Sequence, residues 1–534
     1  MAPSLAPTIL QRRIAIAAAL CVAAFALVGV RLVDVTLIKE LPQRVVPVAE
    51  APRSRPDIVD RNGQLLARDL PTKDVYARVK LLGDRARAAR LIAQATGDNP
   101  VRIARLLDGR HPYILVARQL SPDALLRVMS LGLRGLEYQS SNKRIYPDGR
   151  AAAQVLGVTD PDDHGLSGIE LGLDARMRAM PAGARVQLSL DMRVQYALAH
   201  ELRLSKEKFS ARAAGGIVMD VNTGEILAMA SLPDFDPNLR DVGAQSGRNR
   251  MVQDRYELGS VFKIFSFALA LQDRTTRLDE VFPIGDNLRV GRHIIHDAER
   301  MPAALAARDI FAQSSNIGTA QIALRSGAAR QREFLASLGL LQAPDTELAE
   351  TAAPLIPRNW GDLETATIGF GQGISVTPLA FVAAAAAIVN GGRRIQPTFL
   401  RHPADARGEQ VISPQTSVAM RALMRYVVTD GTGKKADVPG YDVGGKTGSA
   451  QVPGPHGYVP HKLLTSFCGV FPIDNPHYLV FVMLDEPNGT KDTFGFALAG
   501  YTAAPLAGAV IARVAPILGL VPKTPVLADA RKTP

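Results

Sequence analysis

The stretch Ser260–Lys263, with the sequence Ser-Val-Phe-Lys, places a nucleophilic hydroxyl and an amine three residues apart. Residues at this spacing share one face of a helix, so both side chains would point into one cleft. Ser314–Asn316 (Ser-Ser-Asn) and Lys446–Gly448 (Lys-Thr-Gly) follow in that order. The second motif supplies a hydroxyl for proton transfer and an amide to hold a peptide, and the third supplies a cation beside a hydroxyl. Together they predict a serine acyltransferase with a lysine base.

Short motifs also occur by chance, and two stretches of this chain are examples. Ser205–Lys208 has the Ser-x-x-Lys pattern, and Ser140–Asn142 also has the sequence Ser-Ser-Asn. The first lies in a charged, solvated stretch and the second precedes any nucleophile, so their context does not support them. Lys-Thr-Gly occurs once, and the ordered set of three therefore begins at Ser260.

The setting of each motif suits a role in acyl transfer. Ser260 opens an apolar helix, where free N–H groups and the helix dipole favour an oxyanion. Lys263 can act as a base only when neutral, which requires burial and a nearby positive charge to lower its pKa. Lys446 is expected to supply that charge, and the burial is expected from Phe262, Ile264 and Phe265. We expect the catalytic residues to be Ser260, Lys263, Ser314, Asn316 and Lys446.

The third motif lies on a predicted strand that is rich in glycine, Gly444–Gly448. Glycine inside a strand usually marks a bulge or a close approach of another backbone. A substrate peptide that pairs with this strand would place its carbonyl between the N–H groups of Ser260 and Ser449, which predicts an oxyanion hole. Substrate-binding residues are expected at Thr447, Gly448 and Ser449, with Lys446 and Thr447 holding the terminal carboxylate.

Composition indicates a folded chain of two or three domains, because 47% of its 534 residues are hydrophobic and 21% are charged. The net charge is +11, and arginines between residues 85 and 144 alternate with Leu and Ala. Without clustering or interleaved aromatic residues, this pattern indicates a solvated basic face and does not favour nucleic acid. Such a face would also suit an anionic membrane or cell-wall polymer.

One segment, Ile14–Val30, has no charge and is just long enough to span a bilayer when Arg31 snorkels to the interface. A cleaved signal peptide is the alternative, but the small-residue site Ala49–Ala51 lies far beyond the apolar stretch. We expect a retained anchor at 14–35 after a short cytoplasmic tail, 1–13. Charges on both flanks leave the orientation open, but the order of elements places the remaining domains on the far side.

The pattern beyond the anchor predicts an α+β fold. A first α+β domain is expected over 40–185, beginning with an extended linker at 40–56, with a hairpin at Asn62-Gly63 and two or three short helices between 84 and 135. A second domain is expected over 190–522, in which helices pack on an antiparallel sheet. Its expected strands are 215–220, 225–230, 442–452, 464–471 and 478–485, and its helices 192–208, 264–271, 317–324, 378–389, 416–428 and 503–515. A polar tail, 523–534, ends the chain.

Other reactive side chains fit structural roles better. His293 and His296 resemble half of a metal site, but no cluster completes it, so neither a metal nor a cofactor is expected. Glu347 and Glu350 lie where a deacylating glutamate could stand, yet they are interpreted as structural acids. Cys21 in the anchor and Cys468 in an apolar strand cannot pair, and Cys468 is expected to be an inert core residue.

With these motifs the chain resembles the class B penicillin-binding proteins from the anchor to about residue 520. The resemblance extends to 58–63, 165–170, 220–233, 370–373 and 503–505. It implies a membrane-anchored pedestal followed by a penicillin-binding transpeptidase domain. The expected substrates are peptidoglycan stem peptides, with β-lactams as inhibitors.

Ser314–Gly318 (Ser-Ser-Asn-Ile-Gly) resembles the division-specific branch, whereas elongation-specific members usually carry aspartate in place of Asn316. The resemblance then implies a single-pass inner-membrane protein with a periplasmic catalytic domain at the septum. Its implied partners are a multi-span glycan polymerase and other division proteins. The chain departs from the family at Leu258, Pro56 and Ser449, where proline, glycine and threonine are usual, and Ser449 could weaken a side-chain contact to the substrate carboxylate.

Several readings remain open from the sequence. The first is a D,D-transpeptidase, septal or elongation-specific. The second is a hydrolase, either a carboxypeptidase or a β-lactamase, and the third is a non-catalytic scaffold that binds penicillin. The single anchor, the large pedestal and the missing deacylating acid favour the first over the second, and the complete set of motifs argues against the third.

Overall fold

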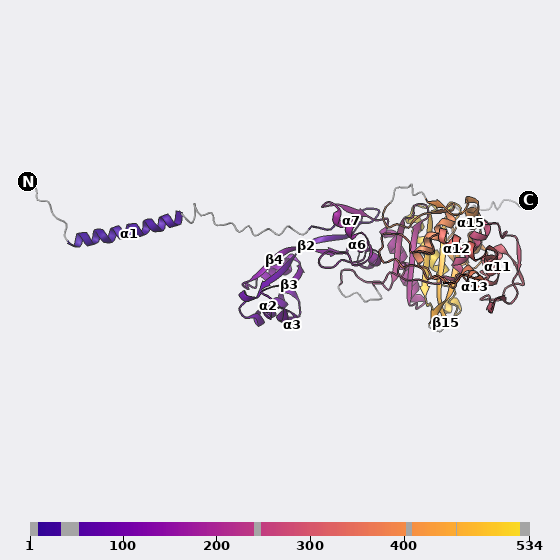
Figure 1. Ribbon diagram of the computed structural model, residues 1–534, viewed down its shortest axis with the longest axis horizontal. Helices are drawn as coiled ribbons and strands as arrows, with labels where there is room; N and C mark the ends of the chain where they lie inside the picture. Colours follow the sequence, from indigo (N-terminus) through magenta and orange to yellow (C-terminus); the bar gives the residue numbers. More distant parts are fainter. Residues whose placement is uncertain (1–8, 34–52, 240–246, 402–407, 455–456, 524–534) are drawn as a thin grey trace, which may run out of the picture. The chain divides into compact units, whose positions relative to one another are not determined.

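The computed structural model describes residues 9–33, 53–239, 247–401, 408–454 and 457–523. These residues form helices together with mainly antiparallel strands, so the predicted α+β class is confirmed. The chain divides into two units (Figure 1). One unit contains Pro71–Asn142 together with the N-terminal residues, and the other contains Ser54–Leu70 together with all residues from Lys143 onward.

The predicted anchor is a helix, α1 (Ile9–Val33). Its segment Arg12–Val33 has a hydropathy of 2.4 and buries none of its surface, and within the described residues it is the one helix long and apolar enough to cross a membrane. The finding suggests a single-pass anchor. Residues 1–8 of the expected tail, 34–35 of the anchor, 40–52 of the linker and 524–534 of the polar tail lie outside the described residues.

The first unit has a small core between strands and three short helices. Three strands form its sheet: the second half of β2 (Leu65–Arg78), β3 (Tyr113–Leu120) and β4 (Leu136–Ile145). The helices are α2 (Arg85–Thr96), α3 (Pro100–Leu106) and α4 (Pro122–Met129), which confirms the predicted short helices. Each begins at a polar residue whose side chain accepts a backbone N–H of the first turn: Asp84, Asn99 and Ser121.

The second unit begins with the predicted hairpin. Strand β1 (Asp57–Val59) pairs antiparallel with the start of β2 and parallel with β5 (Arg185–Gln187). In the turn, Gly63 has φ +88°, and the Asp60 carboxylate accepts the N–H groups of Asn62 and Gln64. The Asn-Gly signal therefore located a real turn.

A buried ionic cluster, formed by Arg55, Arg144, Asp69, Glu170 and Asp174, lies next to this hairpin in the same unit. The Nε atoms of Arg55 and Arg144 lie 2.6 and 2.7 Å from the two carboxylate oxygens of Glu170, whose side chain is fully buried. Asp69 accepts from Arg144, and Asp174 accepts from Arg55. Because every charge has an opposite partner, the cluster can exist away from water.

A five-stranded antiparallel sheet with the order β14-β15-β16-β6-β7 forms the centre of the second unit. The strands are β6 (Ala213–Asp220), β7 (Ile226–Leu232), β14 (Gly444–Gly454), β15 (Gly457–Phe471) and β16 (Tyr478–Asp485). Successive side chains of a strand point to opposite faces. In β16, accordingly, Leu479, Phe481 and Met483 join one hydrophobic core, and Val480, Val482 and Leu484 join another.

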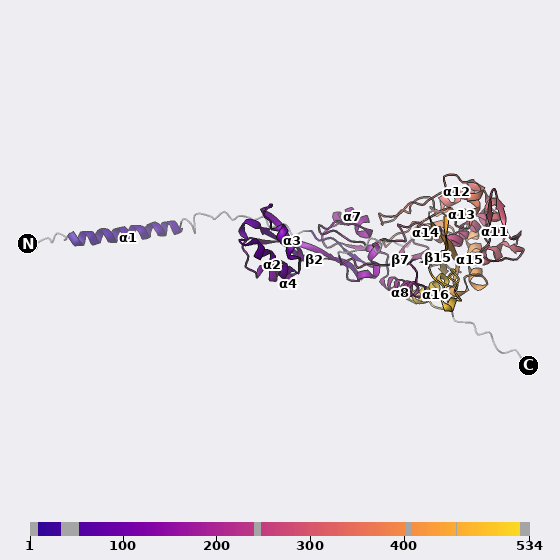
Figure 2. The same ribbon diagram turned by 90° about the horizontal axis from the view of Figure 1, so that it is seen from below.

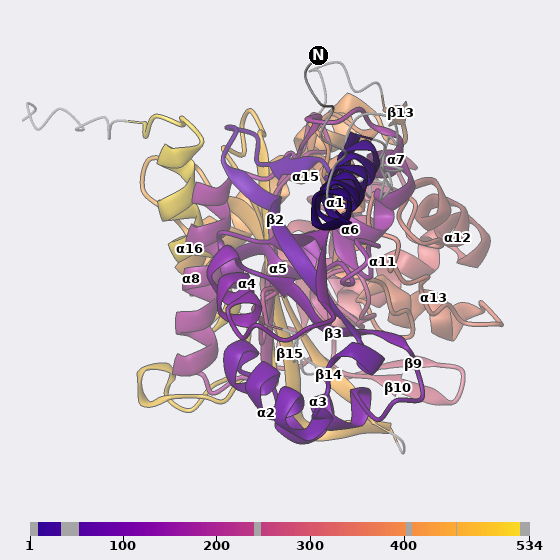
Figure 3. The same cartoon turned by 90° about the vertical axis from the view of Figure 1, so that its left-hand side faces the viewer.

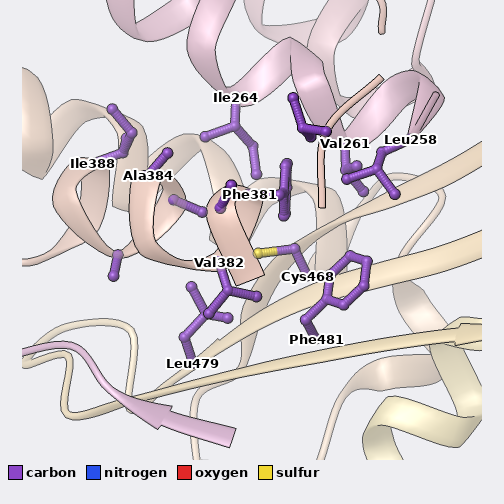
Figure 4. Packing of buried hydrophobic residues seen from close by; sticks show 14 of the residues in the cluster. Leu258, Val261, Ile264, Phe381, Val382, Ala384, Ile388, Cys468, Leu479 and Phe481 are labelled. Atoms are coloured by element: carbon purple, nitrogen blue, oxygen red, sulfur yellow. The ribbon is translucent and has the colours of Figure 1, made fainter. Parts of the chain in front are cut away.

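Helices cover both faces of this sheet. One face packs against α8 (Met192–Lys208) and α16 (Ala503–Ile517), which lie side by side (Figures 2 and 3). The other packs against α9 (Lys263–Gln272), α14 (Pro378–Val389) and α15 (Pro414–Thr429). These five helices agree with the predicted ranges. In Figure 4 Phe381 of α14 lies over Phe481 of the sheet, and their ring centroids are 5.4 Å apart.

The remaining elements of the second unit frame the catalytic motifs or connect larger parts. They are η3 (Gly149–Ala152), α5 (Ala153–Leu156), α6 (Gly168–Gly172), α7 (Asp174–Ala179), η4 (Gly259–Phe262), β8 (Val281–Pro283), β9 (Leu288–Val290), β10 (His293–Ile295), β11 (Ala304–Ala306), α10 (Ala307–Gln313), α11 (Asn316–Ser326), α12 (Ala328–Ser337), α13 (Asp362–Gly369), β12 (Arg393–Arg394), β13 (Glu409–Gln410), η5 (Lys434–Ala436) and η6 (Lys491–Thr493).

Candidate active site

Ser260 lies in the 3₁₀ turn η4, immediately before α9 begins at Lys263. The sequence predicted that Ser260 begins the apolar helix. In the structure the 3₁₀ turn precedes the helix, and Ser260 lies within that turn. Gly259 has φ +61°, and its N–H donates to the carbonyl oxygen of Gly371. A Cβ atom at Gly448 would lie 2.7 Å from the carbonyl oxygen of Leu258, so glycine there lets β14 approach the nucleophile turn.

The side chain of Lys263 is completely buried and points toward the second motif. Its Nζ donates to the carbonyl oxygen of Ser314 at 2.5 Å and to Oδ1 of Asn316 at 2.9 Å. It also lies 3.1 Å from Oγ of Ser314. The first two motifs therefore meet through this amine.

Lys446 approaches the same serine from β14. Its Nζ lies 3.0 Å from Oγ of Ser314 and also contacts the carbonyl oxygen of Thr447. Like Lys263, Lys446 is completely buried. The Ser314 hydroxyl thus lies between two buried amines that come from different elements.

Both lysines lose protons more readily than a lysine in water. Burial, followed by the positive charge of Lys446, holds the pKa of Lys263 well below its ordinary value, although Asp297 opposes this shift. Burial lowers the pKa of Lys446 to about 7. The lowered pKa of Lys263 favours its neutral amine, which is the form a general base requires.

Ser314 has an unusual backbone, with φ +67° in the left-handed region that few residues other than glycine adopt. It ends α10, and Ser315 then caps α11 by accepting the N–H of Gly318. Such conformations gather at functional sites, where the surrounding structure holds them in place. Here the conformation places Oγ of Ser314 within hydrogen-bonding distance of both lysines.

Asp297 was missed by the sequence analysis, although it holds the Ser-Ser-Asn motif in position. Its carboxylate accepts the hydroxyl of Ser315 at 2.8 Å and the backbone N–H groups of Asn316 and Ile317. The signal available was a lone aspartate next to His296 in a polar loop. No residue spacing typical of a known motif connects it to Ser315, which lies 18 residues later.

A cavity of about 390 Å³ contains Ser260 together with Ser314, Asn316, Thr447 and Ser449. Among the described residues Oγ of Ser260 makes no hydrogen bond, so this hydroxyl is available to a substrate. In the central sheet β14 pairs with β15 alone, which leaves its other edge unpaired within the described part of the chain. An extended peptide could pair with such an edge.

Two hydroxyl contacts shape the wall of the cavity near the third motif. Oγ1 of Thr432 lies 2.6 Å from Oγ1 of Thr447. The hydroxyl of Ser449 accepts the N–H of Ala499 at 3.0 Å and is therefore engaged by a loop. The contact uses a lone pair of the oxygen and leaves the hydroxyl proton of Ser449 available to an acceptor.

The other reactive residues identified in the sequence make contacts that fit a structural role. Glu347 accepts the Thr398 hydroxyl and the N–H of Phe399, and Glu350 accepts the N–H of Gly168. His296 contributes its carbonyl oxygen to Asn316. Cys468 is fully buried, and burial raises the pKa of its thiol, which agrees with an inert core residue.

Comparison with known proteins finds two matching family descriptions. The penicillin binding protein transpeptidase domain matches residues 214–509, and the penicillin-binding protein dimerisation domain matches residues 50–194. The chain is 38% identical over 486 residues to the probable peptidoglycan D,D-transpeptidase FtsI of Caulobacter vibrioides, covering 88% of this chain and 82% of the relative. It is 29% identical over 522 residues to the peptidoglycan D,D-transpeptidase FtsI of Escherichia coli K12, with coverages of 91% and 87%.

Among solved structures, penicillin binding protein 3 of Mycobacterium tuberculosis in complex with aztreonam is similar, with a TM-score of 0.70 and 27% identity. The similarity covers 89% of this chain and 98% of that one. The ampicillin complex of the same protein is 28% identical, with the same TM-score and coverage. The chain therefore belongs to the class B penicillin-binding proteins, in which a dimerisation domain precedes the transpeptidase domain.

Proposed function

We propose that Ser260, Lys263, Ser314, Asn316 and Lys446 carry out acyl transfer in this protein, a peptidoglycan D,D-transpeptidase of the FtsI type that binds β-lactams. The observation that carries the proposal is the position of the Ser314 hydroxyl between the amines of Lys263 and Lys446. A hydroxyl has two acceptor lone pairs and one proton. If Ser314 accepts from Lys446 and directs its proton to the lone pair of neutral Lys263, it can pass protons between the base and the cavity.

In the first half-reaction Lys263 removes the proton of Ser260. Oγ of Ser260 then attacks the carbonyl carbon of the penultimate D-Ala. The N–H groups of Ser260 and Ser449 stabilise the resulting oxyanion, while Lys446 and Thr447 hold the terminal carboxylate and Gly448 leaves room for the substrate backbone. As the C–N bond breaks, the leaving amine of D-Ala receives the proton through Ser314.

In the second half-reaction an amine of another stem peptide attacks the ester carbon of the acyl-enzyme. Its proton passes to Lys263, the C–Oγ bond breaks, and Ser260 recovers a proton. Asn316 holds the Lys263 amine and is also available to the substrate peptide. The structural contacts of Glu347 and Glu350 supply no deacylating base, which favours transfer to an amine over hydrolysis.

Labelling with a fluorescent penicillin, followed by mass spectrometry of the labelled peptide, tests the proposal. Ser260→Ala should abolish the label, whereas the matched variant Ser205→Ala, in the chance Ser-x-x-Lys stretch, should keep it. A label on another serine would contradict the assignment of the nucleophile. Rapid release of the label would instead indicate a β-lactamase.

The protein is further proposed to act at the division septum, anchored through α1 in the inner membrane with its catalytic domain in the periplasm. Asn316 and the FtsI-type relatives support this role. Gly29 and the alanines of α1 offer a small-residue face for packing against a partner helix, such as a multi-span glycan polymerase. The proposed domain bounds remain 1–13, 14–35, 40–185, 190–522 and 523–534.

Depletion in the native cell, combined with a fluorescent fusion, tests the septal role. Filamentous cells and mid-cell fluorescence would support it. Rounded cells with dispersed fluorescence would reassign the protein to elongation and leave the acyl-transfer chemistry unchanged.

A further inference from the structure

Two exposed lysines, Lys434 and Lys435, line the same cavity as Ser260. They form the start of η5, two residues after Thr432. Among the described residues, the lysines in ion pairs are Lys208, Lys462 and Lys523. Within that part of the chain, the ammonium groups of Lys434 and Lys435 therefore have no anionic partner and can meet an anion in the cavity.

The turn that carries the two lysines is well supported. Nζ of Lys435 lies 4.3 Å from the ring centroid of Tyr501, and that ring stacks on Phe496. Behind the turn, a Cβ atom at Gly508 of α16 would lie 3.1 Å from the carbonyl oxygen of Lys435. Glycine at this position lets the helix support η5 closely, and Lys435 is held beside Tyr501, which lines the same cavity.

The position of Thr432 identifies which part of the reaction the lysines face. In the proposed function Lys446 and Thr447 hold the terminal carboxylate, which belongs to the D-Ala that leaves. The hydroxyls of Thr432 and Thr447 are 2.6 Å apart, so the turn that follows Thr432 lies at the leaving-group end. The attacking amine of the second half-reaction must occupy the position that the leaving amine vacated, because the two steps are mirror images of each other.

We infer that Lys434 and Lys435, next to the clamp of Lys446 and Thr447, complete an acceptor subsite that selects amines carrying a carboxylate. The inference rests on the proposed role of Ser260. The two cations attract the carboxylate as the amine approaches the ester carbon. The amine nitrogen then bonds to that carbon, the C–Oγ bond breaks, and the amine proton passes to Lys263 and on to Ser260. Each exposed ion pair with the carboxylate is weak and screened by salt. The two lysines therefore affect which amine is accepted and take no part in bond formation.

The experiment compares two acceptors on one acyl-enzyme. The full-length protein is acylated with a D-alanyl thioester, and aminolysis by D-alanine is measured against aminolysis by D-alaninamide, which lacks the carboxylate. The wild type should prefer D-alanine at low salt. The double variant K434Q/K435Q should lower this preference about fivefold, and salt should lower it in the wild type. The preference is the rate with D-alanine divided by the rate with D-alaninamide. A loss of folded or acylated protein lowers both rates equally and leaves the ratio unchanged. Lys206→Gln, a lysine of α8 outside the cavity, should keep the wild-type ratio.

A double variant with the wild-type ratio would overturn the inference. If that variant also reacted more slowly with benzylpenicillin, the lysines would serve the carboxylate of the donor instead. Failure of the wild type itself to form a penicillin adduct on Ser260 would overturn the proposed function and this inference together. The adduct measurement separates that case from failure of the subsite alone.

Discussion

Nζ of Lys446 lies 3.0 Å from Oγ of Ser314. The carboxylate clamp expected from the sequence is therefore not a lysine that projects freely into the cavity. Lys446 is fully buried and contacts Ser314 and Thr447, so we propose that its charge acts on both the proton relay and the carboxylate.

Lys446→Ala should weaken acylation by about 10- to 150-fold, because a charge-assisted hydrogen bond contributes about 1.5–3 kcal/mol. An analogue with its carboxylate converted to an amide should lose far less. Stopped-flow acylation rates for both compounds make the comparison. Equal losses would show that Lys446 acts on Lys263 and Ser314 but not on the substrate.

The acylation rate should depend on pH through both lysines. Because the pKa of Lys263 lies well below its ordinary value, the base gains its reactive form, and the rate rises, at lower pH than for a lysine in water. Above about pH 7 Lys446 loses its proton and the rate should decline. The measurement is kcat/KM for a carboxylate-bearing thioester between pH 5 and 10. A rate that climbs steadily to pH 10 would show that Lys263 titrates like a lysine in water.

Lys263→Arg should reduce acylation by about 10²- to 10⁴-fold, the range attributed to general bases. Arginine keeps the positive charge but does not lose its proton at accessible pH. Binding of a non-acylating substrate analogue should survive in the folded variant. Near-normal acylation would move the role of base to another group.

Asp297→Asn should slow acylation about tenfold, since the amide cannot accept all three hydrogen bonds that position the second motif. The matched control is Asp286→Asn, an exposed aspartate of the same region, which should react normally. The charge of Asp297 also raises the pKa of Lys263. Its removal should therefore lower that pKa further and move the pH profile to lower pH. Loss of rate with an unchanged pH profile would indicate general damage to the loop.

Glu170→Gln should destabilise the second unit by about 3–5 kcal/mol, because Arg55 and Arg144 would lose their shared buried partner. Thermal scans of the full chain should show an earlier transition. Glu137→Gln, which breaks an exposed pair with Arg78, provides the control and should leave the scan unchanged. Similar behaviour of the two variants would mean that the cluster contributes little to stability.

The sequence predicted the elements of the fold well and the contacts of the site in part. Hydrophobic patterning located the sheet and its covering helices, because burial on one face leaves a periodic pattern and burial on both faces leaves a continuous apolar run. The motifs predicted that Lys263, Ser314 and Lys446 meet. The left-handed backbone of Ser314 and the support from Asp297 left no such record, since both depend on how loops distant in sequence come together.

The burial of Lys263 has a consequence for what a penicillin label reports. In an unfolded chain this lysine would return to a pKa near 10.4 and stay protonated, and Ser260 would be an ordinary hydroxyl. Covalent labelling would then count only molecules whose second unit is folded. Labelled protein as a fraction of total protein becomes a conformational assay, suited to following refolding, thermal inactivation or the yield of active protein in membranes.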